Sequence, residues 1–228
     1  MKRVLKPKML YFGTPVVLVS SLNADGSTNV APMSSAWWVG ETAMLGLSVN
    51  SQTVRNLEQR PMCVLNLADE AMVGAVDRLA LLTGRADVPE YKRARGYACE
   101  PDKFTPAGLT PASLGAGLPC AVAESPIQIE GRVQSIREID GPDSGLRALE
   151  VSVLRTRVDD SLIMAHHPTY IDPLRWNPLF MKFTEYFSGA TLIRPSSLAR
   201  GWSMPPLPAP DAVVATGTRS PRGSLVGL

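Results

Sequence analysis

The sequence predicts a mainly β protein with a few short helices, in which antiparallel strands form a barrel or a sandwich. Three observations support this class. Short β-branched and apolar runs recur along the chain, glycine-containing turn signals separate them, and a long run alternates apolar and polar side chains. With 228 residues, 45% of them hydrophobic, the chain is long enough for one core. We expect a single domain over residues 1–202 and a Pro- and Gly-rich tail over 203–228.

The first predicted feature is a hairpin. Residues 16–21 are apolar and β-branched, and Asp25-Gly26 follows where a turn needs a residue that tolerates positive φ. The return strand is expected to begin near Thr28. We expect Pro32 to end it, because proline has no N–H group to donate to a neighbouring strand. Polar side chains after Pro32 would then lie where the sheet stops.

The next predicted features are a buried strand over 42–49 and a helix that follows it. Asn50 or Ser51 is a suitable N-cap, and Pro61 limits the helix to residue 60. The first turn would leave backbone N–H groups without partners beside the positive end of the helix dipole, which predicts an anion site. An ordinary helix cap is the alternative interpretation.

Two further stretches have strand patterns. Residues 62–67 form a short apolar run after the helix. From residue 127, apolar and polar side chains alternate with a one-residue phase slip near Ser135, which indicates a long antiparallel strand with one face in water. Residues 148–158 are expected to return as its partner after a turn over 139–145.

The stretch between these strands is expected to be a helical excursion packed on the sheet, and not a second domain. Residues 70–82 carry apolar side chains at helical spacing, with Gly84 as a C-terminal cap. A shorter helix is expected over 89–96, where the run Lys92-Arg93-Ala94-Arg95 would form a solvated face. Residues 104–119 have neither helical nor strand periodicity and are expected to be a loop.

Composition excludes several classes of protein. The net charge is only +2, and no basic stripe of the kind that binds nucleic acid is present. The three cysteines are widely spaced and odd in number, which argues against a disulfide framework and for a reducing compartment. No apolar run of secretory or membrane-spanning length occurs, so we expect a cytoplasmic protein that binds no membrane. The two histidines have no further ligands at metal spacing, and no metal site is expected.

Several short motifs then occur in a fixed order along the chain. They are Asn29-Val30-Ala31-Pro32-Met33-Ser34-Ser35, Asn50-Ser51-Gln52-Thr53-Val54-Arg55-Asn56, Asp102-Lys103-Phe104, Ala107-Gly108-Leu109-Thr110 and Ala123-Glu124-Ser125-Pro126-Ile127. In this order and spacing, about residues 9–200 resemble the flavin reductase-like family. The resemblance implies the FMN-binding split β-barrel, a Greek-key antiparallel barrel. It also implies FMN as cofactor, with FAD as the alternative, and NAD(P)H as co-substrate.

The resemblance assigns expected roles to individual residues. Contacts to the isoalloxazine ring and the ribityl chain would come from Asn29, Ala31, Pro32, Met33, Ser34 and Ser35. The phosphate and the ribityl hydroxyls would be surrounded by Ser48, Asn50, Ser51, Thr53 and Asn56. In hydride transfer, Lys103 and Phe104 would border the nicotinamide or substrate space, and His166 would bond the flavin or position the hydride donor. A connector loop and a local turn bond are the respective alternatives.

Three functions are compatible with this reading. The first is an NAD(P)H-dependent flavin reductase, supplying reduced flavin to a partner monooxygenase. The others are an oxidoreductase that keeps its FMN and acts on its own organic substrate, and a non-enzymatic electron carrier of the flavoredoxin kind. No catalytic triad or Rossmann fingerprint is found, and hydride transfer needs neither because the cofactor carries the chemistry. The resemblance further implies a homodimer with the flavin at the subunit boundary, where Trp37 or Trp38 would lie if it is not a core residue.

Overall fold

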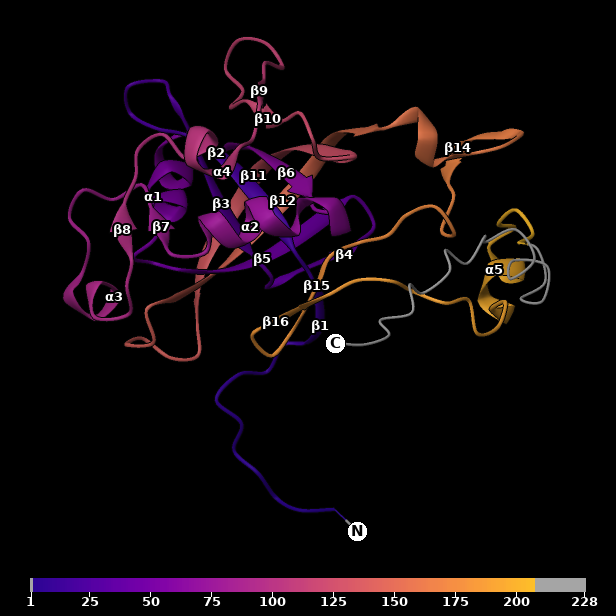
Figure 1. Ribbon diagram of the computed structural model, residues 1–228, viewed down its shortest axis with the longest axis horizontal. Coiled ribbons are helices and arrows are strands. Elements are labelled where there is room, and N and C mark those ends of the chain that lie inside the picture. Colours follow the sequence, from indigo (N-terminus) through magenta and orange to yellow (C-terminus); the bar gives the residue numbers. More distant parts are fainter. Residues whose placement is uncertain (1, 208–228) are drawn as a thin grey trace, which may run out of the picture.

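A seven-stranded antiparallel sheet forms the centre of the molecule in the computed structural model, which describes residues 2–207 (Figure 1). The mainly β class is therefore confirmed. The strand order is β3-β2-β6-β11-β12-β5-β4. The strands are β2 (Val17–Leu22), β3 (Thr28–Met33), β4 (Ala36–Val39), β5 (Thr42–Ser48), β6 (Met62–Leu67), β11 (Ile127–Ile139) and β12 (Leu146–Val158).

The sheet curls around one apolar core. Val19 of β2, near one edge of the sheet, and Ala36 of β4, at the other edge, belong to the same buried cluster. Val54 and Leu57 of helix α1 (Gln52–Gln59), three residues apart in the sequence, complete this cluster. The sheet therefore encloses its own core as a barrel does.

The long hairpin of β11 and β12 contains the predicted irregularity. The pairing shifts between Val133 and Ser135, where one extra residue forms a β-bulge and exchanges the two faces of the strand. The one-residue phase slip in the sequence is confirmed as this bulge.

The strand β3 corrects one prediction. Gly26 has φ of 86° in the turn, as expected, but β3 continues through Pro32, which pairs with Leu18, and ends at Met33. Because β3 is an edge strand, Pro32 can lack an N–H donor there without loss of a ladder hydrogen bond.

Residues 69–122, between β6 and β11, form a layer that we call the excursion. Its α2 and α4 pack on the outer face of β2 and β3, where Leu18 and Val30 form a second buried cluster with Leu79 and Phe104. The elements of the excursion are η1 (Glu70–Met72), α2 (Val73–Leu79), β7 (Leu82–Thr83), α3 (Glu90–Arg93), β8 (Ala98–Cys99), α4 (Phe104–Ala107), β9 (Pro111–Ala112) and β10 (Ala121–Val122).

Two predictions for the excursion are wrong in detail. The helix over 70–82 ends at Leu79, and Gly84 follows β7 instead of capping the helix. Gly84 has no side chain there because a Cβ atom would lie 2.7 Å from Oδ1 of Asn29. The loop over 104–119 begins with the single helical turn α4, which Gly108 closes in the left-handed conformation.

The remaining elements lie at the margins of the barrel. Strands β1 (Phe12–Pro15), β15 (Phe180–Lys182) and β16 (Glu185–Phe187) form a three-stranded sheet, and η2 (Asp160–Leu162), β13 (Ile163–Met164), β14 (His167–Ile171) and α5 (Ser197–Gly201) follow β12 or end the described chain. Most of the predicted tail, residues 208–228, lies outside the described residues. Within residues 2–207 no helix is long and apolar enough to cross a membrane.

Candidate functional site

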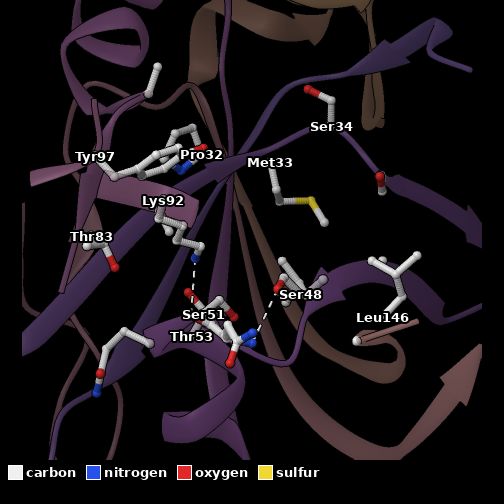
Figure 2. A pocket seen from close by; sticks show the side chains of 18 of the residues that line it. Pro32, Met33, Ser34, Ser48, Ser51, Thr53, Thr83, Lys92, Tyr97 and Leu146 are labelled. Carbon is white, nitrogen blue, oxygen red and sulfur yellow. Dashed lines mark hydrogen bonds between the residues drawn. The ribbon is translucent and has the colours of Figure 1, made fainter. Parts of the chain in front are cut away.

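A cavity of about 680 Å³ lies between the barrel and the excursion (Figure 2). One wall comes from the ends of β3 and β5, the start of α1 and the turn between β11 and β12, and the other wall comes from the excursion. Its lining residues are Tyr11, Ala31, Pro32, Met33, Ser34, Ser35, Gly46, Leu47, Ser48, Asn50, Ser51, Gln52, Thr53, Ala80, Leu82, Thr83, Tyr91, Lys92, Arg95, Tyr97, Lys103, Asp143, Ser144, Gly145 and Leu146.

The N-terminus of α1 opens into this cavity. Ser51 is the N-cap, and its hydroxyl accepts a hydrogen bond of 3.1 Å from Val54 N. The backbone N–H groups of Gln52 and Thr53 have no hydrogen-bond partner among residues 2–207. Because the helix dipole adds positive charge at this end, the first turn presents two free donors to an anion in the cavity.

Lys92 of α3 faces the same point from the excursion. Its Nζ donates a hydrogen bond of 3.1 Å to the carbonyl oxygen of Asn50, and Figure 2 shows the side chain extended toward Ser51 and Thr53. Partial burial lowers the pKa of the Lys92 ammonium. The prediction that residues 92–95 form a solvated face holds for Arg93, Ala94 and Arg95, which are exposed, whereas Lys92 is half-buried.

Lys103 is the most buried charged group that lines the cavity, with 2% of its surface exposed. No hydrogen bond or salt bridge to its ammonium is found within the described part of the chain. Burial lowers the pKa of Lys103 to about 8, and the positive charge of Lys92 contributes to this shift. A charge buried without a partner costs stability, so this position favours an anionic ligand.

The motif after the first hairpin lines the middle of the cavity. Residues 31–35 all contribute to the lining, and Ser35 Oγ donates a hydrogen bond of 3.1 Å to Tyr11 Oη. Gly46 N donates to Ser35 O at 2.8 Å, which joins β5 to this segment. The cavity therefore brings ten of the predicted site residues together: Ala31, Pro32, Met33, Ser34, Ser35, Ser48, Asn50, Ser51, Thr53 and Lys103.

Two predicted asparagines lie behind the cavity wall. Asn29 Nδ2 donates to Thr53 Oγ1 at 3.3 Å, and its buried Oδ1 has no partner. Asn56 Nδ2 donates to Ser21 Oγ at 3.0 Å and to Asn23 Oδ1 at 2.9 Å. These bonds fix α1 against the first hairpin, so both asparagines position the site without lining it.

The other two predicted residues lie outside the cavity lining. Phe104 is buried in the second apolar cluster beside α2. His166 is exposed in the turn between β13 and β14, with φ of 64°. Figure 1 places β14 at the opposite side of the molecule from α1 and α3, so His166 is remote from this cavity.

Several lining residues were not predicted. Tyr91, Arg95 and Tyr97 come from α3 and the turn after it, and the turn over 143–146 between β11 and β12 also lines the cavity. The available signal was the cationic run at 92–95 between two tyrosines, a pattern typical of a polar ligand site as well as of a solvated helix. The turn over 143–146 had no such signal, because only the bend of the long hairpin brings it there.

The chain belongs to the flavin reductase-like family: the model of the flavin reductase like domain matches residues 9–174. Its structure matches the split barrels of this family, so the predicted fold is confirmed. It is 34% identical over 183 residues to the uncharacterized protein YdfE of Bacillus subtilis (strain 168), covering 80% of this chain and 87% of the relative. The flavoredoxin of Desulfovibrio vulgaris (Miyazaki F) superposes with a TM-score of 0.70 at 20% identity, over 88% of this chain and 100% of that one. Nitrilotriacetate monooxygenase component B from Bacillus cereus superposes with a TM-score of 0.65 at 18% identity, over 83% of this chain and 96% of that one.

Proposed function

We propose that the chain is an NAD(P)H-dependent flavin reductase that binds FMN in the cavity between barrel and excursion. The observation that carries this proposal is that two free backbone donors of α1 and two lysine side chains line one cavity, with Lys92 bonded to Asn50 O beside the start of the helix. A phosphate monoester needs such a site, because it brings about two negative charges and three acceptor oxygens. Membership of the flavin reductase-like family supports the choice of ligand.

The shape of the cavity gives the orientation of the flavin in this proposal. The phosphate lies at the N-terminus of α1, where Ser51, Thr53 and Lys92 surround it. The ring system then lies against residues 31–35, which combine apolar side chains with the hydroxyls of Ser34 and Ser35. A volume of about 680 Å³ is within the range of ligand pockets for a molecule of this size, and it leaves space for a second group.

When bound, FMN supplies the chemistry of hydride acceptance, and the chain supplies binding and orientation. Met33 and Pro32 lie on the barrel side of the cavity, and Tyr97 lines it from the excursion. These side chains exclude water from the ring face and leave the nicotinamide space on the excursion side. Phe104 supports that side from the apolar cluster behind, whereas Lys103 lines the cavity within electrostatic reach of Lys92.

A homodimer is part of the proposal. Trp37 and Val39 of the edge strand β4 have 56% and 63% of their surfaces exposed. Beside them lies an apolar hollow of about 380 Å³ that shares Tyr11 and Ser35 with the cavity. A second protomer on this surface would cover the apolar side chains and complete the cavity. A contact between His166 and flavin would then have to come from the partner protomer.

The test is the visible absorption spectrum of the protein with FMN, followed by anaerobic addition of NADH and, separately, NADPH. Rapid bleaching by one nucleotide is the expected result. Bound FMN that neither nucleotide reduces would favour the second candidate, an electron carrier, which the superposition with a flavoredoxin supports. A protein that binds no FMN would contradict both.

The partner of the reductase is also a proposal. The chain shares its fold with a protein named as component B of a monooxygenase, which supports a role in supplying reduced flavin to an oxygenase. The experiment is oxygen consumption by a candidate oxygenase with this protein, NAD(P)H and FMN. If the oxygenase does not raise oxygen consumption above that of the reductase alone, the proposed partner would be contradicted and the proposed flavin reduction would be unaffected.

A further inference from the structure

Two lysines from separate parts of the excursion line one cavity, and neither forms a salt bridge within residues 2–207. Lys92 comes from α3, and Lys103 comes from the segment between β8 and α4. The Nζ atom of Lys92 donates a hydrogen bond of 3.1 Å to Asn50 O, and only 2% of the surface of Lys103 is exposed. Their charges repel each other closely enough to affect the protonation of Lys103. Two like charges that line one cavity favour the binding of an anion near both of them.

From this geometry we infer that Lys103 is a proton-linked second cation for the flavin phosphate, and that it works with Lys92 and the N-terminus of α1. The inference rests on the proposed function and adds a coupling to it: a proton and the phosphate bind together. The phosphate has two negative charges above about pH 7. It is neutralised by two ammonium groups only while Lys103 carries its proton.

The groups around Lys103 determine the direction of the coupling. Lys92 of α3 disfavours the charged form, while Cys99 of β8 and Glu100, which follows it, favour the charged form weakly. Burial is the largest influence, and it brings the pKa in the unliganded protein to about 8. A phosphate placed beside the ammonium raises this pKa, because an opposite charge favours the protonated state. Binding above pH 8 therefore takes one proton from the solvent, which joins the neutral amine of Lys103.

Two consequences follow. Near pH 7 the ammonium is already formed, so FMN binding takes up almost no proton. Between about pH 8.5 and 9.5 the uptake approaches one proton, and the affinity for FMN falls by up to about tenfold per pH unit. Riboflavin has the same ring and ribityl chain without the phosphate, so its binding shows neither effect.

The experiment is isothermal titration calorimetry of the unliganded protein with FMN and with riboflavin at pH 9. Two buffers of different ionisation enthalpy are used, because their difference in measured heat gives the number of protons taken up. The wild type is expected to take up more than half a proton with FMN and none with riboflavin. Lys103→Met is expected to take up none and to bind FMN at least about tenfold more weakly at pH 7, with riboflavin unchanged.

Two further variants keep the inference falsifiable. Lys103→Arg keeps the charge at every accessible pH, so it is expected to bind FMN without proton uptake. This variant also serves if Lys103→Met does not fold, which a circular dichroism melt reveals. Lys182→Met replaces an exposed lysine of β15 outside the cavity and is expected to behave as the wild type.

Two outcomes would contradict the inference and would leave the proposed function unaffected. One is proton uptake that persists in both Lys103 variants, because another group would then be responsible. The other is an equal loss of FMN and riboflavin affinity in Lys103→Met, because the lysine would then contact the ring. A wild type that binds neither flavin would instead contradict the proposed function itself.

Discussion

Two buried polar groups of the barrel, Glu130 and Asn66, are paired within the protein, whereas the excursion contains a buried lysine whose ammonium has no partner within residues 2–207. Glu130 of β11 is 6% exposed, and its Oε1 accepts a hydrogen bond of 2.9 Å from Arg157. Asn66 of β6 is fully buried, donates to Leu18 O at 2.8 Å and accepts from Val122 N at 2.8 Å. Lys103 is as deeply buried as these residues, yet its ammonium has no such bond within residues 2–207.

The difference separates the groups that stabilise the fold from those that bind the ligand in our proposal. A paired buried group is satisfied by folding alone, so removing its partner destabilises the protein. An unpaired cation is satisfied only when an anion enters the cavity, so it lowers the stability of the unliganded state. The paired groups of the barrel therefore stabilise the fold. The unpaired lysine of the excursion lowers the free energy of unfolding of the unliganded protein, and in our proposal it is part of the binding site.

The largest expected effect is on the barrel. Leu65 of β6 is completely buried in the main cluster, and Leu65→Ala would leave a cavity there. We expect the free energy of unfolding to fall by about 2–5 kcal/mol. Urea denaturation measures this loss, and FMN affinity at low temperature should stay within about twofold of the wild type. A large loss of affinity in the folded variant would mean that barrel and site are not separable.

The next effect has the opposite sign. Lys103→Met replaces the unpaired cation by an apolar side chain of similar length, and the unliganded protein is expected to gain about 1–3 kcal/mol at pH 7. The pH dependence follows from the pKa values. Lys103 titrates near 8 in the folded protein and near 10.5 in the unfolded chain, so the unfolded state binds more protons between these values. The stability of the wild type should rise with pH in that window, and the Lys103→Met variant should lack this rise.

Urea denaturation at pH 7 and pH 10 without flavin measures both effects. Lys182→Met is the matched control, because this lysine of β15 is exposed. If Lys103→Met were less stable than the wild type at both pH values, the lysine would be a structural residue and the contrast between the two regions would fail.

The smallest effect concerns the cavity mouth. Arg95 lines the cavity, and its guanidinium lies 5.7 Å from the centre of the Tyr91 ring. We expect Arg95→Ala to raise KM for the nicotinamide nucleotide by about two- to fivefold with kcat unchanged, because an exposed cation contributes little to binding a phosphate. Arg93→Ala, also on the excursion but outside the lining, is the control in steady-state assays. An equal change of KM in both variants would show that Arg95 has no specific role in binding the nucleotide.

The same contrast explains what the sequence could predict. In the barrel, local patterns decide the structure: Ser51 caps α1, Gly26 turns the first hairpin, and the phase slip near Ser135 becomes a bulge. Each of these features depends on neighbours in the sequence, so a short window contains the signal. The main error was the prediction that β3 ends at Pro32. It arose because the sequence does not show that β3 is an edge strand, where a proline is tolerated.

The excursion could not be predicted as well, because its contacts are between distant residues. Gly84 has the signal of a helix cap, yet it is small because the amide of Asn29 packs against it. Lys92 has the sequence of a solvated helix face, and only the fold brings it to Asn50. The motif residues of the barrel wall and Lys103 were thus found from the sequence, while Lys92 and Arg95 of the wall opposite needed the structure.

The central claim is that a phosphate group binds at the N-terminus of α1, and a pair of substitutions at Ser51 tests it most directly. Aspartate and asparagine are both good N-caps, so Ser51→Asp and Ser51→Asn should preserve the helix and differ only in charge. The measurement is the dissociation constant of FMN for the two variants, with riboflavin as the reference ligand. The account predicts that Ser51→Asp binds FMN at least about 30-fold more weakly than Ser51→Asn, while the two bind riboflavin equally. Equal FMN affinities in the two variants would contradict it, because the phosphate would then lie elsewhere.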